Sequence, residues 1–131
     1  MTKLDNVPFT MPFTEELGVE ITHASAERVT ATLHVRAALC TTGRRLHGGA
    51  IMALADSLGA IGAYLSRPED SHGTTTIESK SNFLGAAKRD TIISAESTPL
   101  HVGRRTSVWQ TRIHDDAGKP IAIVTQTQMV L

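Results

Sequence analysis

Residues 46–65, LHGGAIMALADSLGAIGAYL, constrain the fold of this chain more than any other segment. The segment reads as one long apolar helix that opens with His47-Gly48-Gly49, and Asp56 is its single charged side chain from Gly48 to Leu65. Its length approaches that of a membrane-spanning helix. Because Asp56, four glycines and many alanines make a poor membrane span, we interpret the segment as a buried core helix that other elements must wrap.

Length, charge and cysteine content narrow the class of protein. The chain has 131 residues, which predicts one domain over residues 1–131. Its 13 basic and 13 acidic side chains give no net charge, which argues against bulk electrostatic binding to nucleic acid or an anionic membrane. Cys40 is the only cysteine, so no intramolecular disulfide can form, and the N-terminus lacks a signal-peptide pattern. We therefore predict a cytoplasmic protein.

Strand patterns flank the apolar helix on both sides. The six predicted strands cover residues 19–23, 29–35, 74–84, 91–99, 106–113 and 120–130. A short helical turn is expected at 14–18 and a polar loop at 36–45. Short connections between consecutive strands imply antiparallel pairing. The order β-β-α-β-β-β-β therefore predicts an α+β fold, and because its sheet covers only one side of the helix, self-association is expected.

Asp56 is the residue that this arrangement must explain. A lone buried carboxylate costs several kcal/mol, so it must pair, face a pocket or lie at an interface. One interpretation is a structural aspartate that bonds a neighbouring loop or subunit. The other is a functional carboxylate, because hydrolysis of an activated carbonyl needs a nucleophile or a base for water.

The strand order, the His47-Gly48-Gly49 motif and an acid nine residues after the histidine together resemble the hotdog-fold acyl-CoA thioesterases, specifically the PaaI-like and 4-hydroxybenzoyl-CoA thioesterase branch. The segments TTTIESKSNFLGAAKRD and HVGRRTSVWQTRI are also similar to that branch, and the likeness covers roughly residues 15–131. The resemblance implies a hotdog fold and hydrolysis of an acyl-CoA whose acyl group is aromatic or of medium size. It also implies a homodimer or homotetramer with shared active sites. No metal or redox cofactor is expected, since coenzyme A is part of the substrate.

The resemblance assigns roles to individual residues. Asp56 is implied as the catalytic carboxylate, with direct attack and activation of water both open. The N–H of Gly48 is implied to polarise the thioester oxygen from the positive end of the helix. His47 and Gly49 are implied to shape the loop that positions the substrate, and Thr76 to hold the attacking water. The structural alternatives are that Gly48 and Gly49 only permit tight packing and that Thr76 is present for its β-propensity.

One position departs from the family pattern. Relatives often place Asn or Gln six residues before the motif histidine, where this chain has Thr41 as the candidate substrate-positioning residue, whose hydroxyl reaches less far.

The spacing along the helix predicts a site shared between subunits. Helical rise separates His47 from Asp56 by roughly 13 Å. One thioester therefore cannot contact both Gly48 and Asp56 of the same chain, and two subunits must supply them.

Two basic pairs are candidates for holding the phosphates of coenzyme A. They are Lys88-Arg89 and Arg104-Arg105, and arginine binds phosphate in a bidentate manner. The alternative is that each pair is a solvated turn. For the acyl group, Leu54, Leu58 and Ile61 are candidate wall residues if they face the pocket.

Other functions remain as alternatives. A hotdog hydratase or dehydratase would carry a Pro-Gly-His approach loop, which is absent from this sequence. A non-catalytic acyl-CoA-binding protein would hold Asp56 in a purely structural role. Cys40 could serve as a thiol nucleophile, but a small hydrophobic side chain in a loop explains it better. The six histidines show no tight metal-ligand spacing.

Overall fold

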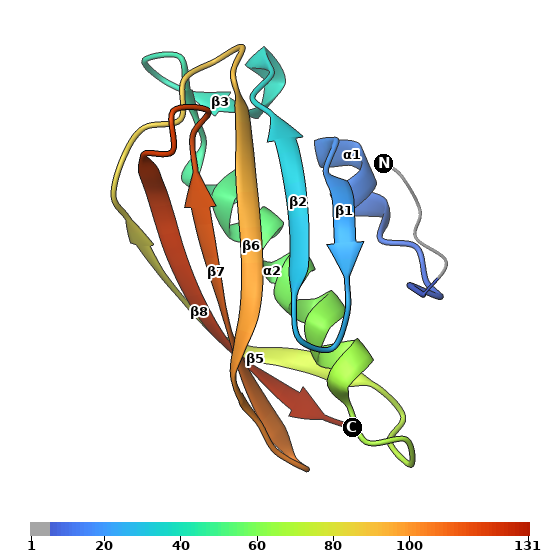
Figure 1. Cartoon of the computed structure of the whole chain (residues 1–131). Coiled ribbons are helices and arrows are strands. Elements are labelled where there is room, and N and C mark those ends of the chain that lie inside the picture. The colour runs from blue at the N-terminus through green and yellow to red at the C-terminus, as the bar shows by residue number, and fades with distance from the viewer. Residues whose placement is uncertain (1–5) are drawn as a thin grey trace.

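The structure, a computed structural model, describes residues 6–131 as a six-stranded antiparallel sheet wrapped around one long helix, α2 (Gly48–Ser66) (Figure 1). The strands run in the sheet order β1-β2-β6-β7-β8-β5. Their bounds are β1 Glu20–Ala24, β2 Val29–His34, β5 Thr74–Phe83, β6 Ile92–Val102, β7 Thr106–His114 and β8 Pro120–Val130. The remaining elements are α1 (Pro12–Leu17), a 3₁₀ turn η1 (Ala37–Leu39) and a small ribbon of β3 (Cys40–Thr41) and β4 (Arg45–Leu46). The predicted α+β class and the order of the long elements are confirmed.

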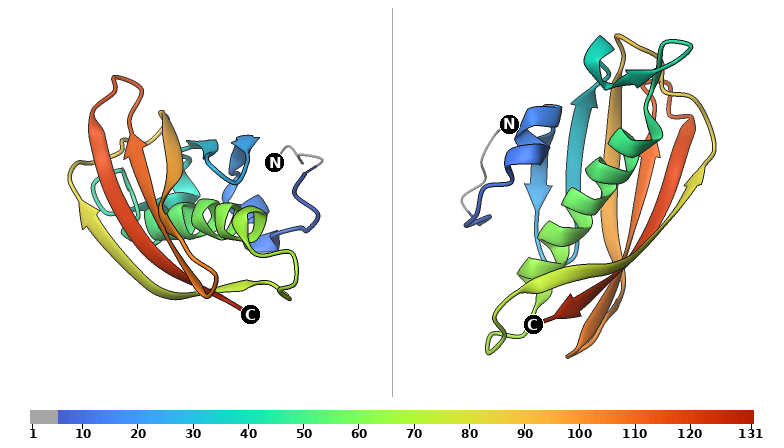
Figure 2. Two further views of the ribbon diagram at one scale, coloured as in Figure 1. Left: turned by 60° about the horizontal axis from the view of Figure 1, so that its bottom comes forward. Right: turned by 180° about the vertical axis from the view of Figure 1, so that it is seen from behind.

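Helix α2 lies in the concave face of the curved sheet, as two further views show (Figure 2). It is long and apolar enough to cross a membrane, but more than half of it is buried inside the fold, as expected of a core helix. Leu54, Leu58 and Ile61 belong to the core cluster and are at most 1% exposed. The condition set for them, that they face the pocket, is therefore not met, because they pack in the core between α2 and the sheet.

Two glycines let α2 approach the sheet closely. A Cβ atom at Gly62 would lie 2.5 Å from two ring carbons of Trp109, and one at Gly59 would lie 2.6 Å from the amide nitrogen and oxygen of Gln126. Both partners are fully buried. The spacing of the two glycines, one helical turn apart, therefore seats the helix over β7 and β8.

We expect Gly62→Ala to destabilise the protein. Alanine would gain about 1 kcal/mol of helix propensity. The clash with the rigid Trp109 ring costs about 1–3 kcal/mol for overpacking and should dominate. Urea unfolding followed by circular dichroism measures the difference, and a variant more stable than the wild type would contradict this packing.

The structure corrects three details of the sequence analysis. A bulge between Ile21 and His23 turns His23 outward, whereas strict alternation along the predicted strand 19–23 would place it on the face of Ile21. Strand β6 runs on to Val102 rather than ending at Pro99. Its pairing with β2 stops at Ser97, opposite Val29, the first residue of β2, so Pro99 lies where β6 is an edge strand and proline is tolerated. Residues 36–45 form η1 and the β3–β4 ribbon instead of an irregular loop.

Strand β5 is an open edge of the sheet. It pairs only with β8 along the described chain, and most of its side chains are exposed. Two of them are large apolar residues, with Ile77 56% and Phe83 53% exposed. An unpaired edge with apolar side chains is a template for pairing with another strand.

Candidate active site

The first part of the site is the N-terminus of α2. His47 is the N-cap residue, and its Nδ1 accepts a hydrogen bond of 2.7 Å from the backbone N–H of Gly49. Since Nδ1 is the acceptor, a neutral His47 ring carries its proton on Nε2. Gly48 is the first helical residue, so its N–H has no partner within the helix. The cap thus leaves one donor, the N–H of Gly48, at the positive end of α2.

A pocket of about 440 Å³ opens at this helix end. It is lined by Thr41, Arg45, Leu46, Gly48, Ile51, Phe83, Leu84, Gly85 and Ala86. A Cβ atom at Gly48 would lie 3.3 Å from the Phe83 ring, so the glycine leaves room for close approach to the backbone. The structure therefore brings Thr41 and Gly48 to one pocket, whose walls combine apolar side chains with the polar Thr41 and Arg45.

The second part of the site is Asp56, on the exposed side of α2. The Oδ1 atom of Asp56 accepts a hydrogen bond of 2.7 Å from the Thr76 hydroxyl and one of 3.2 Å from Nε2 of Gln126. Nε2 of Gln128 in turn donates to the Thr76 hydroxyl at 2.7 Å. Among residues 6–131 no partner is found for Oδ2. The carboxylate is thus held firmly at one oxygen and open at the other.

These contacts answer the burial question raised by the sequence. Asp56 is exposed in the single chain rather than buried, so its charge needs no ion-pair partner there. Thr76 of β5 was predicted to hold the attacking water; the structure places its hydroxyl on Asp56, and the role toward water stays a prediction. The sequence analysis missed Gln126 and Gln128 of β8. Both glutamines lie in a strand whose alternation predicts burial, and a buried amide is the one signal that could have marked them.

Basic residues gather beside the first pocket. A second pocket of about 540 Å³ is lined by Gly43, Arg44, Arg45, Ala86, Lys88 and Arg89, and it shares Arg45 and Ala86 with the first. An antiparallel bridge between Arg45 and Lys88 joins the two basic segments. The sequence analysis missed Arg44 and Arg45, although they stand directly before the helix motif. This cluster suits a polyphosphate better than either pair alone.

The other basic pair lies elsewhere. Arg104 and Arg105 follow β6 and line a pocket of about 180 Å³ with Asp70, beyond the C-terminal end of α2. Arg104 already forms an ion pair of 2.8 Å with Asp70. Within one chain the structure therefore does not bring Arg104 and Arg105 together with Lys88 and Arg89.

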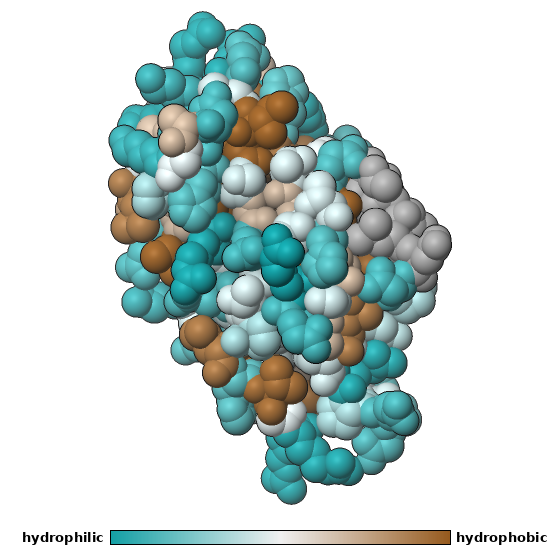
Figure 3. Space-filling model, viewed as in Figure 1, coloured by the Kyte–Doolittle hydropathy of each residue, from teal (hydrophilic) through white to brown (hydrophobic). Residues whose placement is uncertain are grey.

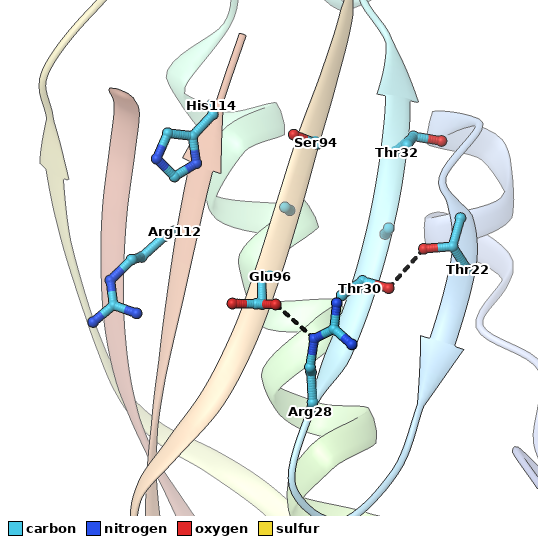
Figure 4. Close-up of a pocket in the computed structure, with 10 residues that line it drawn as sticks. Thr22, Arg28, Thr30, Thr32, Ser94, Glu96, Arg112 and His114 are labelled. Carbon is cyan, nitrogen blue, oxygen red and sulfur yellow. Dashed lines mark hydrogen bonds and ion pairs between the residues drawn. The ribbon is translucent and has the colours of Figure 1, made fainter. Parts of the chain in front are cut away.

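A further concavity of about 450 Å³ lies on the face of the sheet that points away from α2 (Figure 4). Its strongest contacts are an Arg28–Glu96 ion pair of 2.6 Å and a Thr22–Thr30 hydrogen bond of 2.7 Å. The centre of this face is mostly hydrophilic (Figure 3). None of the predicted site residues lies in this concavity, so we assign the chemistry to the helix side.

A curved antiparallel sheet wrapped around one long helix, with a free N–H at the helix start and an anchored carboxylate at its middle, defines the hotdog class of thioester hydrolases. Residues 43–122 match the thioesterase superfamily, and the chain belongs to this family. The predicted resemblance to hotdog-fold acyl-CoA thioesterases is thereby confirmed, and the protein is an acyl-CoA thioesterase.

Known proteins agree with this assignment. The chain is 31% identical over 103 residues to 1,4-dihydroxy-2-naphthoyl-CoA hydrolase of Escherichia coli, covering 79% of this chain and 74% of the relative. A mutant thioesterase of Pseudomonas aeruginosa superposes with a TM-score of 0.84 at 31% identity, covering 91% and 85% of the two chains. The PaaI protein of Escherichia coli shares the fold, with a TM-score of 0.84 at 19% identity over 93% and 86% of the two chains.

Proposed function

We propose that this thioesterase hydrolyses an acyl-CoA with an aromatic or medium-size acyl group, at sites shared between two subunits of a homodimer or homotetramer. Asp56 of one subunit activates water, and the Gly48 N–H of the partner subunit polarises the carbonyl oxygen. The observation that carries the proposal is the separation of the two groups along α2. Eight residues of helix correspond to about 12 Å, which is too far for one thioester carbonyl.

The open edge of β5 offers a route to such a dimer. Thr76, beside Asp56, and Phe83, beside Gly48, stand at opposite ends of β5. Both pair with residues on the helix-facing side of β8, so they share one face of the sheet. If two copies of β5 pair antiparallel about their middle, near Lys80, Thr76 of one subunit comes beside Phe83 of the partner subunit. That symmetry would place one Asp56 near the partner's Gly48 and would build two equivalent sites.

The proposed chemistry uses only groups of the chain and water. Oδ2 of Asp56 accepts a proton from water while the water oxygen attacks the thioester carbonyl carbon. The Gly48 N–H stabilises the negative charge that develops on the carbonyl oxygen. The C–S bond then breaks, coenzyme A leaves as the thiolate, and the proton returns to it. No metal or redox cofactor takes part. We place the reaction in the cytoplasm, since the lone Cys40 fits a reducing compartment.

Two observations support the substrate class. The pocket at Gly48 has Leu46, Ile51, Phe83 and Leu84 in its walls, which suit an apolar group. The relative from Escherichia coli is named for an aromatic acyl-CoA, a naphthoyl-CoA. A panel of benzoyl-, phenylacetyl-, hexanoyl-, octanoyl- and palmitoyl-CoA, read by release of free thiol, tests the choice. Preferential cleavage of palmitoyl-CoA would contradict the proposed acyl group, and tight binding without cleavage would favour the acyl-CoA-binding alternative.

The basic pocket should recognise the nucleotide half of the substrate. We expect the double variant Arg45→Ala/Lys88→Ala to raise KM for an acyl-CoA about thirtyfold to a thousandfold, because each of the two lost phosphate contacts removes about 1–2 kcal/mol. The same acyl group carried on N-acetylcysteamine, which has no phosphate, is the control and should be hydrolysed as well as by the wild type. Arg104→Ala, measured on both substrates, compares the other basic pair with this pocket. Equal losses on both substrates would contradict phosphate recognition at this pocket.

A further inference from the structure

We propose that Gln126 and Gln128 of β8 are positioning residues, which together direct hydrogen bonds to Oδ1 of Asp56 and leave Oδ2 as the oxygen that reacts. This inference rests on the proposed function of Asp56. Gln126 acts directly, through its Nε2 contact of 3.2 Å to Oδ1. Gln128 acts through Thr76, whose hydroxyl it contacts at 2.7 Å.

The donor inventory fixes the direction of these hydrogen bonds. The amide Nε2 of Gln128 can only donate, so the Thr76 oxygen is the acceptor of that bond. A hydroxyl has one proton, and the 2.7 Å contact to Asp56 requires Thr76 to donate it there. Gln128 therefore fixes the orientation of the Thr76 hydroxyl, and Thr76 fixes one oxygen of the carboxylate. With the Gln126 contact, two donors converge on Oδ1.

The burial of these two amides indicates that they orient Asp56 rather than stabilise the fold. Gln126 is 0% and Gln128 is 1% exposed, between α2 and the sheet. The carbonyl oxygen of each amide is buried and has no hydrogen-bond partner among the described residues, which costs stability. Gly59 leaves no room for a side chain beside the Gln126 amide. An apolar residue of similar size would pack here without that cost, so the fold alone does not require either glutamine.

The experiment compares Gln126→Met and Gln128→Met with wild type, measuring kcat, KM and the melting temperature on the best acyl-CoA. We expect kcat to fall about tenfold to hundredfold, as for loss of a hydrogen bond to a charged group, with KM changed less than about twofold. The melting temperature should stay the same or rise, because methionine removes an unpartnered carbonyl. Thr111→Val, which removes a buried unpartnered hydroxyl from β7, is the control and should leave kcat unchanged.

A double-mutant cycle separates positioning from packing. If Gln128 acts through Thr76, then Gln128→Met should lower kcat less than about twofold in a Thr76→Val background. Thr76→Ser, which keeps the hydroxyl, should retain most of the wild-type kcat. A loss for Gln128→Met that repeats in the Thr76→Val background would overturn the proposal, and so would losses for either glutamine variant that follow a fall in melting temperature.

A second measurement does not depend on turnover. The side-chain amide NMR signals of Gln126 should shift in Asp56→Asn, and those of Gln128 should shift in Thr76→Val. Unshifted signals would overturn the hydrogen-bond network. Inactive Asp56→Asn beside fully active glutamine variants would reject this inference while leaving the proposed function intact. A wild-type protein that cleaves no acyl-CoA would instead reject the proposed mechanism, and the positioning role with it.

Discussion

Replacing Asp56 with alanine should lower kcat for acyl-CoA hydrolysis about 10²- to 10⁴-fold, which is the contribution expected of a positioned general base. The carboxylate is the one acidic side chain of α2, and its free Oδ2 lies on the exposed side of the helix. Asp56→Asn should lose nearly as much activity, because an amide of the same shape cannot accept the proton from water. Stopped assays of thiol release over the acyl-CoA panel measure the loss.

Folding controls make this result decisive. Asp56 is exposed in the single chain and makes no ion pair among the described residues, but Asp56→Ala leaves the buried Gln126 amide without its acceptor and should cost about 1–3 kcal/mol of unfolding free energy. Asp56→Asn keeps an oxygen acceptor at that position and should change the free energy of unfolding less. Asp70→Ala is the matched control: it removes another exposed carboxylate, the partner of Arg104, and should keep near wild-type kcat. Hydrolysis that survives Asp56→Ala unchanged would reject the carboxylate mechanism.

Mixing two inactive variants should restore activity if the site is shared between subunits. Gly48→Pro removes the N–H at the first helical position, where proline is well tolerated, and loss of an oxyanion donor costs about 10²- to 10³-fold. Asp56→Ala subunits still provide Gly48, and Gly48→Pro subunits still provide Asp56. A mixed dimer then has one intact site and one doubly defective site. Random mixing of equal amounts should recover about a quarter of wild-type activity.

The complementation has its own control. Mixing Asp56→Ala with the double variant Asp56→Ala/Gly48→Pro leaves every site without the carboxylate and should recover nothing. Activity from the first mixture together with none from the second would support shared sites. Recovery in neither mixture, with subunit exchange verified by sedimentation or native mass spectrometry, would reject a site shared by Gly48 of one subunit and Asp56 of the other.

The pattern of apolar and polar residues along the chain was sufficient to predict the order of strands and helices. The period-2 alternation of residues 29–35 and the β-branched runs after the helix predicted strands within a few residues of their observed ends. The Gly18 stop and the apolar run from Gly48 predicted the two helices, and residue spacing alone showed that Gly48 and Asp56 are too far apart for one carbonyl. These features depend on neighbours along the chain, so they can be read without knowing the fold.

Contacts between distant segments were decided only by the tertiary structure. The link from Gln128 to Thr76 depends on the register of β8 against β5, and that register shifts at a bulge after Thr76. The basic pocket forms because the β3–β4 ribbon carries Arg45 against Lys88, more than forty residues away. The sequence by itself was enough to predict Gly48 and Asp56 as the two groups of the proposed site. The register of its strands decided which side chains orient them, because partners across a sheet are set by pairing and not by spacing along the chain.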